Sequence, residues 1–189
     1  MEKTKKHEIE VTDIQHREFG FSILLSDNQT RDEKKIFCRK VYLRNTDDFD
    51  KYLEQNNVLD AYVSTAYWER PWKMEGWLGA DLFFDFDYPE DISIPRMEAK
   101  TVIQSLKDDF GLDDVYLIAS GGKGYHVICE DKRIRSIGKT ERGEIVQWIT
   151  TNRDITTLDI ACTIDTHRLR RVPGSYHHNG NPCRILKRI

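Results

Sequence analysis

Short blocks of apolar residues, separated by polar turns, run along the whole chain and predict alternating strands and helices. Strands are expected at residues 19–26, 36–43, 61–67, 81–87, 115–119 and 125–130, with one or two more beyond Thr156. The first two strands would form a hairpin around the polar turn at residues 28–35. Helices are expected at residues 46–57, 96–110 and 140–150. The predicted fold class is α/β (α+β), with mixed sheets flanked by helices.

The helix at residues 96–110 has the clearest pattern, because Pro95 precedes it and Gly111 follows it. Its apolar side chains recur at helical spacing: Ala99, Val102, Ile103, Leu106 and Phe110. Thr46 is expected to cap the first helix. The third helix is expected to bury Ile145, Trp148 and Ile149.

The strand at residues 81–87 ends in the sequence Asp85-Phe86-Asp87. Alternate side chains of a strand point to opposite faces, so Asp85 and Asp87 lie on one face and Leu82, Phe84 and Phe86 on the other. Two adjacent carboxylates repel each other, and a divalent cation such as Mg²⁺ or Mn²⁺ relieves that repulsion. The alternative interpretation is an edge strand that carries two solvated acids.

Composition limits the classes of protein that the chain can represent. With 189 residues, 39% hydrophobic and 32% charged, it has the size of one ordinary soluble domain. It contains no apolar run long enough for a membrane span and no signal-type segment, which predicts a cytoplasmic or nucleoid-associated protein. The four cysteines show no C-x-x-C pairing and are expected to be reduced thiols. The net charge of −3 argues against nonspecific coating of DNA, although basic residues gather between Arg168 and Arg188.

A glycine-rich turn forms a second constellation, in Ser120-Gly121-Gly122-Lys123-Gly124-Tyr125-His126. Glycines permit a tight turn and close approach to a ligand, while Ser120, Lys123 and His126 are typical phosphate-binding groups. The segment leads into a predicted strand and not into a helix, so it is not a P-loop. A plain glycine-rich hairpin is the alternative.

A third constellation begins at Asp159, which lies between Leu158 and Ile160. A carboxylate in apolar surroundings requires a metal ion or a cationic partner. Further anion-binding groups follow at Arg171, Ser175 and His177, around the turn Pro173-Gly174. The alternative is a salt-bridged strand followed by a basic loop.

Taken in order, the three segments resemble the archaeo-eukaryotic primase superfamily, and within it the small catalytic subunit of archaeal and eukaryotic DNA primase. The apolar strand ending in D-x-D, the S-G-x-[RK]-G-x-H turn, and the Asp followed by a basic residue and Pro-x-Ser-x-His all have counterparts here. Weaker similarities are Arg17-Glu18-Phe19-Gly20-Phe21, Arg39, Tyr62-Val63-Ser64 and Tyr67. The resemblance extends from about Arg17 to the end of the sequence.

The resemblance implies a template-directed nucleotidyltransferase, a DNA primase or primase-polymerase that uses two Mg²⁺ or Mn²⁺ ions. It implies Asp85, Asp87 and Asp159 as catalytic metal ligands. It implies these residues as nucleotide-binding groups: Ser120, Lys123, His126, Arg171, His177 and, more weakly, Arg39. The implied partners are NTPs or dNTPs, a single-stranded DNA template, and a large primase subunit or a C-terminal extension. Residues 1–189 are expected to form one catalytic domain, with an N-terminal module at about 1–75 and a metal- and nucleotide-binding module at about 76–189.

The chain also departs from the family pattern. Archaeal members commonly carry a zinc-binding insert after the first motif, but only residues 88–95 fill that place here, without Cys or His, so zinc is not expected. The helical subdomain that many relatives have between the second and third motifs is reduced to residues 140–150. Two other functions stay open: a repair polymerase like the domain attached to some bacterial DNA ligases, and a nucleotide-binding module without activity.

Overall fold

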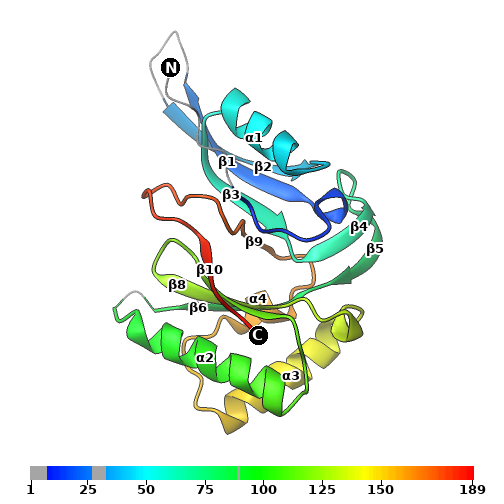
Figure 1. Ribbon diagram of the computed structural model, residues 1–189, viewed down its shortest axis with the longest axis vertical. Helices are drawn as coiled ribbons and strands as arrows, with labels where there is room; N and C mark the ends of the chain where they lie inside the picture. Colours follow the sequence, from blue (N-terminus) through cyan, green and yellow to red (C-terminus); the bar gives the residue numbers. More distant parts are fainter. Residues whose placement is uncertain (1–7, 27–32, 89) are drawn as a thin grey trace.

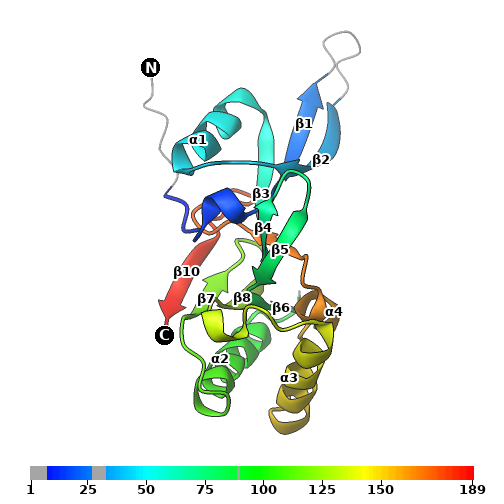
Figure 2. The same ribbon diagram turned by 90° about the vertical axis from the view of Figure 1, so that its right-hand side faces the viewer.

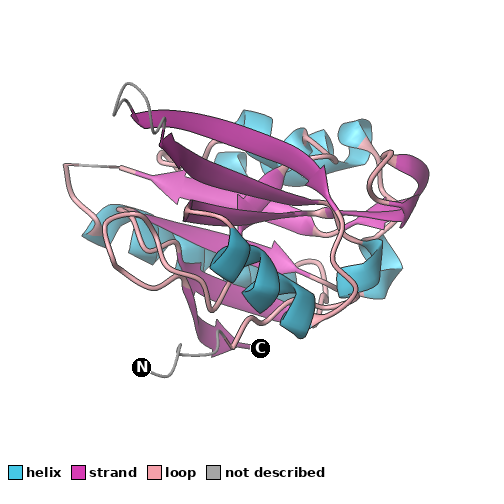
Figure 3. Cartoon of the chain, turned by 90° about the horizontal axis from the view of Figure 1, so that it is seen from above, coloured by secondary structure: helices cyan, strands magenta, loops and turns pink. Residues whose placement is uncertain are grey.

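The computed structural model describes residues 8–26, 33–88 and 90–189, which fold into two four-stranded sheets with helices on their outer sides. In Figure 1 the first sheet lies above the second, α1 covers the outer side of the first, and α2 and α3 lie below the second. Figure 2 shows the same layers from the side, and Figure 3 shows the strands from above. The α+β fold class predicted from the sequence is confirmed.

The first sheet has the order β2-β1-β3-β9 and the second β10-β7-β8-β6. All pairings among the described strands are antiparallel, where mixed sheets were expected. The strands of the first sheet are β1 (Phe19–Ser26), β2 (Glu33–Val41), β3 (Val58–Ser64) and β9 (Leu169–Arg171). Those of the second are β6 (Leu82–Asp87), β7 (Val115–Ala119), β8 (Gly124–Cys129) and β10 (Arg184–Arg188).

A two-stranded hairpin of β4 (Ala66–Arg70) and β5 (Glu75–Ala80) connects the two sheets. The sequence had predicted one continuous strand at residues 61–67, and this was wrong. The chain bends at Thr65, between β3 and β4, and the Ser64 hydroxyl stabilises this bend by donating a hydrogen bond to the carbonyl of Ala66 at 2.6 Å. The predicted turn at residues 28–35 lies largely outside the described residues, and β2 already begins at Glu33.

The helices are α1 (Thr46–Gln55), α2 (Ser93–Asp108), α3 (Lys139–Asn152) and α4 (Ile160–Ile164). The first three agree with the predicted helices within a few residues, whereas α4 was not predicted. Asn45 and not Thr46 caps α1, because the Asn45 side chain accepts a hydrogen bond from the backbone N–H of Asp48 at 3.0 Å. Trp148 is 38% exposed, and Val146 takes its expected place in the core beside Ile149.

Two main hydrophobic cores follow from the period of the apolar residues. Leu82, Phe84 and Phe86 face α2 and α3, as their alternation predicted. Phe19 and Phe21 face α1 and pack with Phe49 in the other core. A smaller cluster fills part of the space between the sheets: Phe83, Ile118, Ile128, Cys162 and Cys183. The cysteines are all free thiols, and all except Cys38 are buried. Among the described residues, no helix has the length and apolar composition needed to cross a bilayer.

A buried ionic cluster joins the N-terminal segment to the start of β6. Arg17 is fully buried, and its Nη1 donates to Asp81 Oδ2 at 2.6 Å and to the carbonyl of Ser64 at 2.9 Å. The Tyr67 hydroxyl donates to the other Asp81 oxygen at 2.7 Å, and the Arg17 guanidinium lies 3.6 Å from the centre of the Tyr67 ring. Arg142 of α3 donates to the carbonyl of Asp81 at 2.9 Å. We call Arg17, Tyr67, Asp81 and Arg142 the ionic hub.

Candidate active site

The end of β6 lies beside the segment that leads into α4, and this brings two of the predicted acids together. The backbone N–H of Asp159 donates to the carbonyl of Asp85 at 2.8 Å, and Phe86 forms an isolated antiparallel bridge with Leu158. The N–H of Asp87 also donates to the carbonyl of Thr157, at 3.3 Å. Asp85 and Asp159 are therefore neighbours through the backbone, although 74 positions separate them in the sequence.

The surroundings of Asp85 and Asp159 are electrostatically different. The Asp85 side chain is 26% exposed, and burial raises its pKa, with a further contribution from Asp159 that Arg168 opposes. Asp159 caps α4: it accepts hydrogen bonds from the Cys162 N–H at 3.1 Å and from the Cys162 thiol at 3.0 Å. The hydrogen bond from that thiol lowers the pKa of Asp159. Asp85 is thus the acid whose charge the fold compensates least.

The acids fit hard divalent cations by their chemistry. Asp85, Asp87 and Asp159 offer only carboxylate oxygens, the ligands that Mg²⁺ and Mn²⁺ prefer. The raised pKa of Asp85 shows that a carboxylate charge here lacks full compensation, and a cation would supply it. The ligand atoms of the three acids do not all lie within 4.8 Å of one another, since Asp87 is on the exposed end of β6. Asp85 and Asp87 line one cleft, whereas Asp159 is exposed, does not line that cleft, and adjoins Asp85 through the backbone.

The turn between β7 and β8 is held by its own hydrogen bonds. The Ser120 hydroxyl donates to the carbonyl of Gly124 at 2.9 Å and accepts from the N–H of Gly122 at 3.2 Å. Gly121 has a φ of +83°, and a Cβ there would lie 2.9 Å from the carbonyl oxygen of Asn181. Glycine at this position therefore allows the turn to approach the loop that contains His177.

A cleft of about 260 Å³ lies between the two sheets at this point. It is lined by seven of the nine predicted site residues: Asp85, Asp87, Ser120, Lys123, His126, Arg171 and His177. The acidic residues of the cleft lie at the end of β6. Its basic groups, which we call the basic side, are Lys123 in the glycine turn, beside β6 in the same sheet, and Arg168, Arg170 and Arg171 in and just before β9 of the other sheet. Such an arrangement suits a ligand that carries phosphate groups and cations together.

His126 forms the floor between these two sides. Its ring is buried and makes an edge contact with Phe83, and its Nε2 lies 3.5 Å from Asp85 Oδ1. Burial, helped by the charges of Arg170 and Arg171, lowers the pKa of His126 to about 3. Burial therefore favours the neutral imidazole, which can offer hydrogen bonds but no charge to the cleft.

Arg39 is not among the residues that line the cleft. It lines a neighbouring hollow of about 320 Å³, which shares Tyr62, Arg168 and Leu169 with the cleft. Its guanidinium forms a bidentate ion pair with the buried Glu18, with Nε 2.9 Å from Oε1 and Nη2 3.0 Å from Oε2. The predicted role of Arg39 in nucleotide binding stays a prediction.

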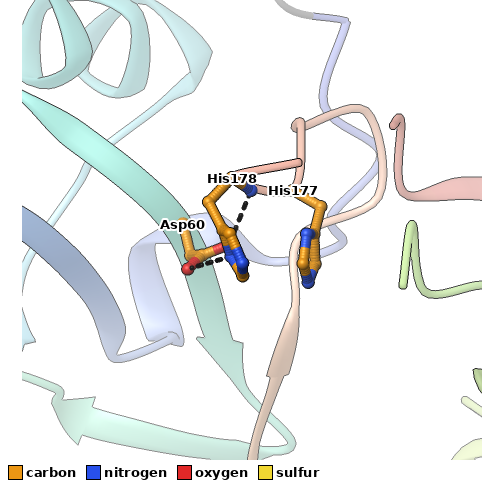
Figure 4. A group of neighbouring side chains, drawn as sticks. All are labelled: Asp60, His177 and His178. Carbon is orange, nitrogen blue, oxygen red and sulfur yellow. Dashed lines mark hydrogen bonds and ion pairs between the residues drawn. The ribbon is translucent and has the colours of Figure 1, made fainter. Parts of the chain in front are cut away.

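The structure also shows site residues that the sequence did not single out. Arg168 lines the cleft, and Asp60, buried on β3, lies beside His177 and His178, with ligand atoms of the three residues within 4.8 Å of one another (Figure 4). Asp60 occupies one position of an otherwise apolar strand, Leu59-Asp60-Ala61, the same signal that drew attention to Asp159. The oxygens of Asp60 already accept hydrogen bonds from Arg171 Nη1 at 2.7 Å and from the His178 N–H at 3.0 Å.

The raised pKa of Asp85 leads to a prediction about stability without metal. A carboxyl group whose pKa is higher in the folded than in the unfolded chain destabilises the fold at neutral pH, and this cost disappears as the pH falls below both pKa values. With EDTA present, we therefore expect Asp85→Asn to unfold at a higher urea concentration than the wild type at pH 7. The two curves should converge as the pH is lowered below about 4. A variant that is less stable at pH 7 would contradict this assignment.

The geometry defines a class: an antiparallel α+β core in which a strand ending in two acids pairs beside a glycine turn, and basic residues of the other sheet line the same cleft, as in a primase-type catalytic core. The fold is similar to that of the polymerase domain of Mycobacterium tuberculosis ligase D, solved in complex with DNA, with a TM-score of 0.61 and 14% identity. That match covers 90% of this chain and 74% of the other.

Sequence comparison narrows the class to one family. A family model for the DNA primase small subunit matches residues 84–155. The DNA primase small subunit of Archaeoglobus fulgidus is 36% identical over 164 residues, which cover 78% of this chain and 47% of that protein. The small subunit of Thermococcus kodakarensis is 28% identical, over 82% of this chain and 48% of that protein. The chain is a relative of the archaeal DNA primase small subunits, and it spans about half the length of these relatives.

Proposed function

We propose that the chain carries the catalytic core of a template-directed nucleotidyltransferase that makes short primers on single-stranded DNA. The observation that carries the proposal is the cleft, which Asp85 and Asp87 line together with Lys123, Arg171 and His177. The relationship to DNA primase small subunits supports the same activity. We also propose that the chain works as one catalytic domain, because β9 from its C-terminal half completes the N-terminal sheet.

In this proposal Asp85, Asp87 and Asp159 hold two Mg²⁺ or Mn²⁺ ions. Such ions activate the attacking 3′-hydroxyl and neutralise the charge that develops on the triphosphate and its pyrophosphate leaving group. The task of the protein residues is to orient the phosphate chain in line with the attacking group, since phosphoryl transfer depends on positioning and charge neutralisation. Asp85 is held rigidly for this purpose by strand pairing on one side and by the Asp159 segment on the other.

The basic side of the cleft would bind the triphosphate. Lys123 and Arg171 supply positive charge, and Ser120, neutral His126 and His177 supply hydrogen bonds. The template and a further polypeptide, either a large primase subunit or an extension of this chain, are proposed partners. A core with a net charge of −3 neutralises few DNA phosphates by itself, so template affinity would depend on that partner.

The decisive experiment measures nucleotide incorporation on single-stranded DNA with Mg²⁺ or Mn²⁺, with and without a primer, using NTPs and dNTPs separately. Synthesis without a primer supports primase activity. Extension of a supplied primer alone supports a repair polymerase, and no incorporation in either case supports a nucleotide-binding module. Adding the related large subunit of an archaeal primase tests the dependence on a partner.

The basic side of the cleft gives a separate prediction. Lys123→Ala removes one cation from the proposed phosphate end, so the Kd for ATP and dATP should rise roughly tenfold, the usual effect of one exposed charge-assisted contact. Isothermal titration calorimetry with Mg²⁺ present measures it. Lys107→Ala, on the exposed side of α2, is the matched control and should leave the Kd unchanged. If both substitutions changed the Kd equally, Lys123 would not be a specific contact of the phosphate chain.

A further inference from the structure

Asp60 is a buried carboxylate on β3 that contacts Arg171 and His178. It is 2% exposed. Burial alone would raise the pKa of Asp60, but the hydrogen bonds from Arg171 and His178 lower that pKa to about 2. Asp60 is therefore ionised over the whole physiological range, and its charge is directed at the rim of the cleft.

The first contact fixes the direction of the Arg171 side chain. Strands β3 and β9 pair with Arg171 opposite Tyr62, and the Arg171 guanidinium lies 5.1 Å from the centre of the Tyr62 ring. Arg171 Nη1 donates to Asp60 Oδ1 at 2.7 Å, and the side chain is 15% exposed. A guanidinium has five N–H donors in a rigid plane, so holding one nitrogen fixes the direction in which the remaining donors point.

The second contact fixes the loop that contains His177. The backbone N–H of His178 donates to Asp60 Oδ1 at 3.0 Å, and its ring Nδ1 lies 3.2 Å from both Asp60 oxygens, as Figure 4 shows. The rings of His177 and His178 are in contact, with centroids 4.0 Å apart. His177 Nδ1 accepts a hydrogen bond from the Asn179 N–H at 3.1 Å, so the neutral His177 ring carries its proton on Nε2.

We infer that Asp60 is a positioning residue that holds Arg171 and the His177–His178 pair in the orientation in which they bind a phosphate chain. This inference rests on the proposed function of the cleft and names a residue outside the motifs that define the site. Asp60 does not face the ligand, because Arg171 and His178 occupy its oxygens. It acts through the arginine and the loop, and it connects them to a rigid strand of the first sheet.

Asp60, His177 and His178 are close enough to share a metal ion, but their hydrogen bonds favour the positioning role. Asp60 Oδ1 already accepts hydrogen bonds from Arg171 Nη1 and the His178 N–H, the His178 ring Nδ1 lies 3.2 Å from Oδ2, and Lys35 Nζ lies 3.7 Å from Oδ2. The Asn179 N–H also binds His177 Nδ1 and leaves the His177 proton on Nε2, so a metal ion could bind either ring nitrogen only after that hydrogen bond is broken. Arg171 therefore takes the place that a cation would occupy.

The test measures binding of inorganic tripolyphosphate, which has the phosphate chain of a nucleotide without base or sugar. Asp60→Asn keeps the shape of the side chain and removes its charge, so the Kd should rise roughly tenfold, as expected when a charge-assisted contact loses its orientation. Asp60→Asn combined with Arg171→Ala should bind no more than about twofold more weakly than Arg171→Ala alone, because most of the effect of Asp60 passes through Arg171 and only the small remainder through the His177 loop. If Asp60 were merely structural, Asp60→Asn would weaken tripolyphosphate binding by the same factor in the wild type and in Arg171→Ala.

Asp131→Asn is the matched control. Asp131 is also buried and holds an arginine, with Arg133 Nε at 2.9 Å, but it lies beyond the end of β8 and does not line the cleft. It should lower the urea midpoint without changing the Kd for tripolyphosphate. If Asp60→Asn does not fold, Arg171→Lys serves instead, because an ammonium cannot hold Asp60 and a phosphate in a fixed fork. The same tenfold loss is then expected.

The outcomes separate this inference from the proposed function. If wild-type protein does not bind tripolyphosphate, the proposed phosphate site is wrong and the inference falls with it. If the wild type binds and Asp60→Asn, or Arg171→Lys in its place, binds equally well, only the inference is overturned. Binding of Zn²⁺ by EDTA-treated wild type that His178→Ala abolishes would also overturn it, in favour of a metal site.

Discussion

Asp85→Asn and Asp159→Asn should each remove nearly all nucleotide incorporation while leaving the protein folded. Each substitution replaces one carboxylate charge by a neutral amide, and the proposed ions then lack a ligand and part of their charge balance. Substituting a residue that only hydrogen-bonds to a metal ligand lowers metal affinity or activity by about 10- to 100-fold. Loss of a ligand itself should therefore lower the rate by on the order of a hundredfold or more. Incorporation of labelled nucleotide into primed and unprimed templates, with saturating Mg²⁺ or Mn²⁺, measures this loss.

Asp108→Asn is the control for charge removal, since Asp108 is exposed on α2. It should leave incorporation unchanged. Circular dichroism of all three variants excludes unfolding as the cause. Full activity in both Asp85→Asn and Asp159→Asn would rule out both residues as metal ligands. Loss of activity in only one variant would leave that residue as a ligand and rule out the other.

The largest loss of stability is expected from the ionic hub. Asp81→Asn leaves the fully buried Arg17 with only the more distant Glu130, at 3.8 Å, as a charged partner, and breaking a buried ion pair from one side costs about 3–5 kcal/mol. For a chain of this length, such a loss lowers Tm by roughly 6–20 °C. Urea unfolding followed by fluorescence measures the free energy of unfolding.

The exposed ion pair between Arg70 and Glu75 provides the comparison. Both side chains are about half exposed, and Arg70→Gln should cost less than about 1 kcal/mol. If Asp81→Asn also cost less than about 1 kcal/mol, the neighbouring carbonyls, and not the Asp81 carboxylate, would compensate the charge of Arg17.

Elements with a strong local pattern could be predicted from the sequence. The strand at residues 115–119 has the predicted bounds, and the alternation in residues 81–87 placed Leu82, Phe84 and Phe86 on the core side. Elements determined by distant contacts could not be predicted. Helix α4 has only five residues, too few for a helical period, and it begins where Asp159 caps it beside β6.

The candidate site shows the same limit. The D-x-D strand and the glycine turn are local sequences, so the sequence alone could single out Asp85, Ser120 and Lys123, which line one cleft. Asp60 could not be connected with Arg171 in this way. The contact arises only when β3 pairs with β9, more than one hundred residues later in the chain.

The pairing of β9 with β3 and of β10 with β7 has a consequence for protein synthesis. Each sheet is completed by one of the last two strands in chain order, so each keeps an unpaired edge while the earlier residues leave the ribosome. Arg171 and His177 emerge with the same late segment. A nascent chain therefore cannot bind phosphate through these residues before the first sheet can close, and until then its exposed β3 edge is a site where it can pair wrongly with another chain.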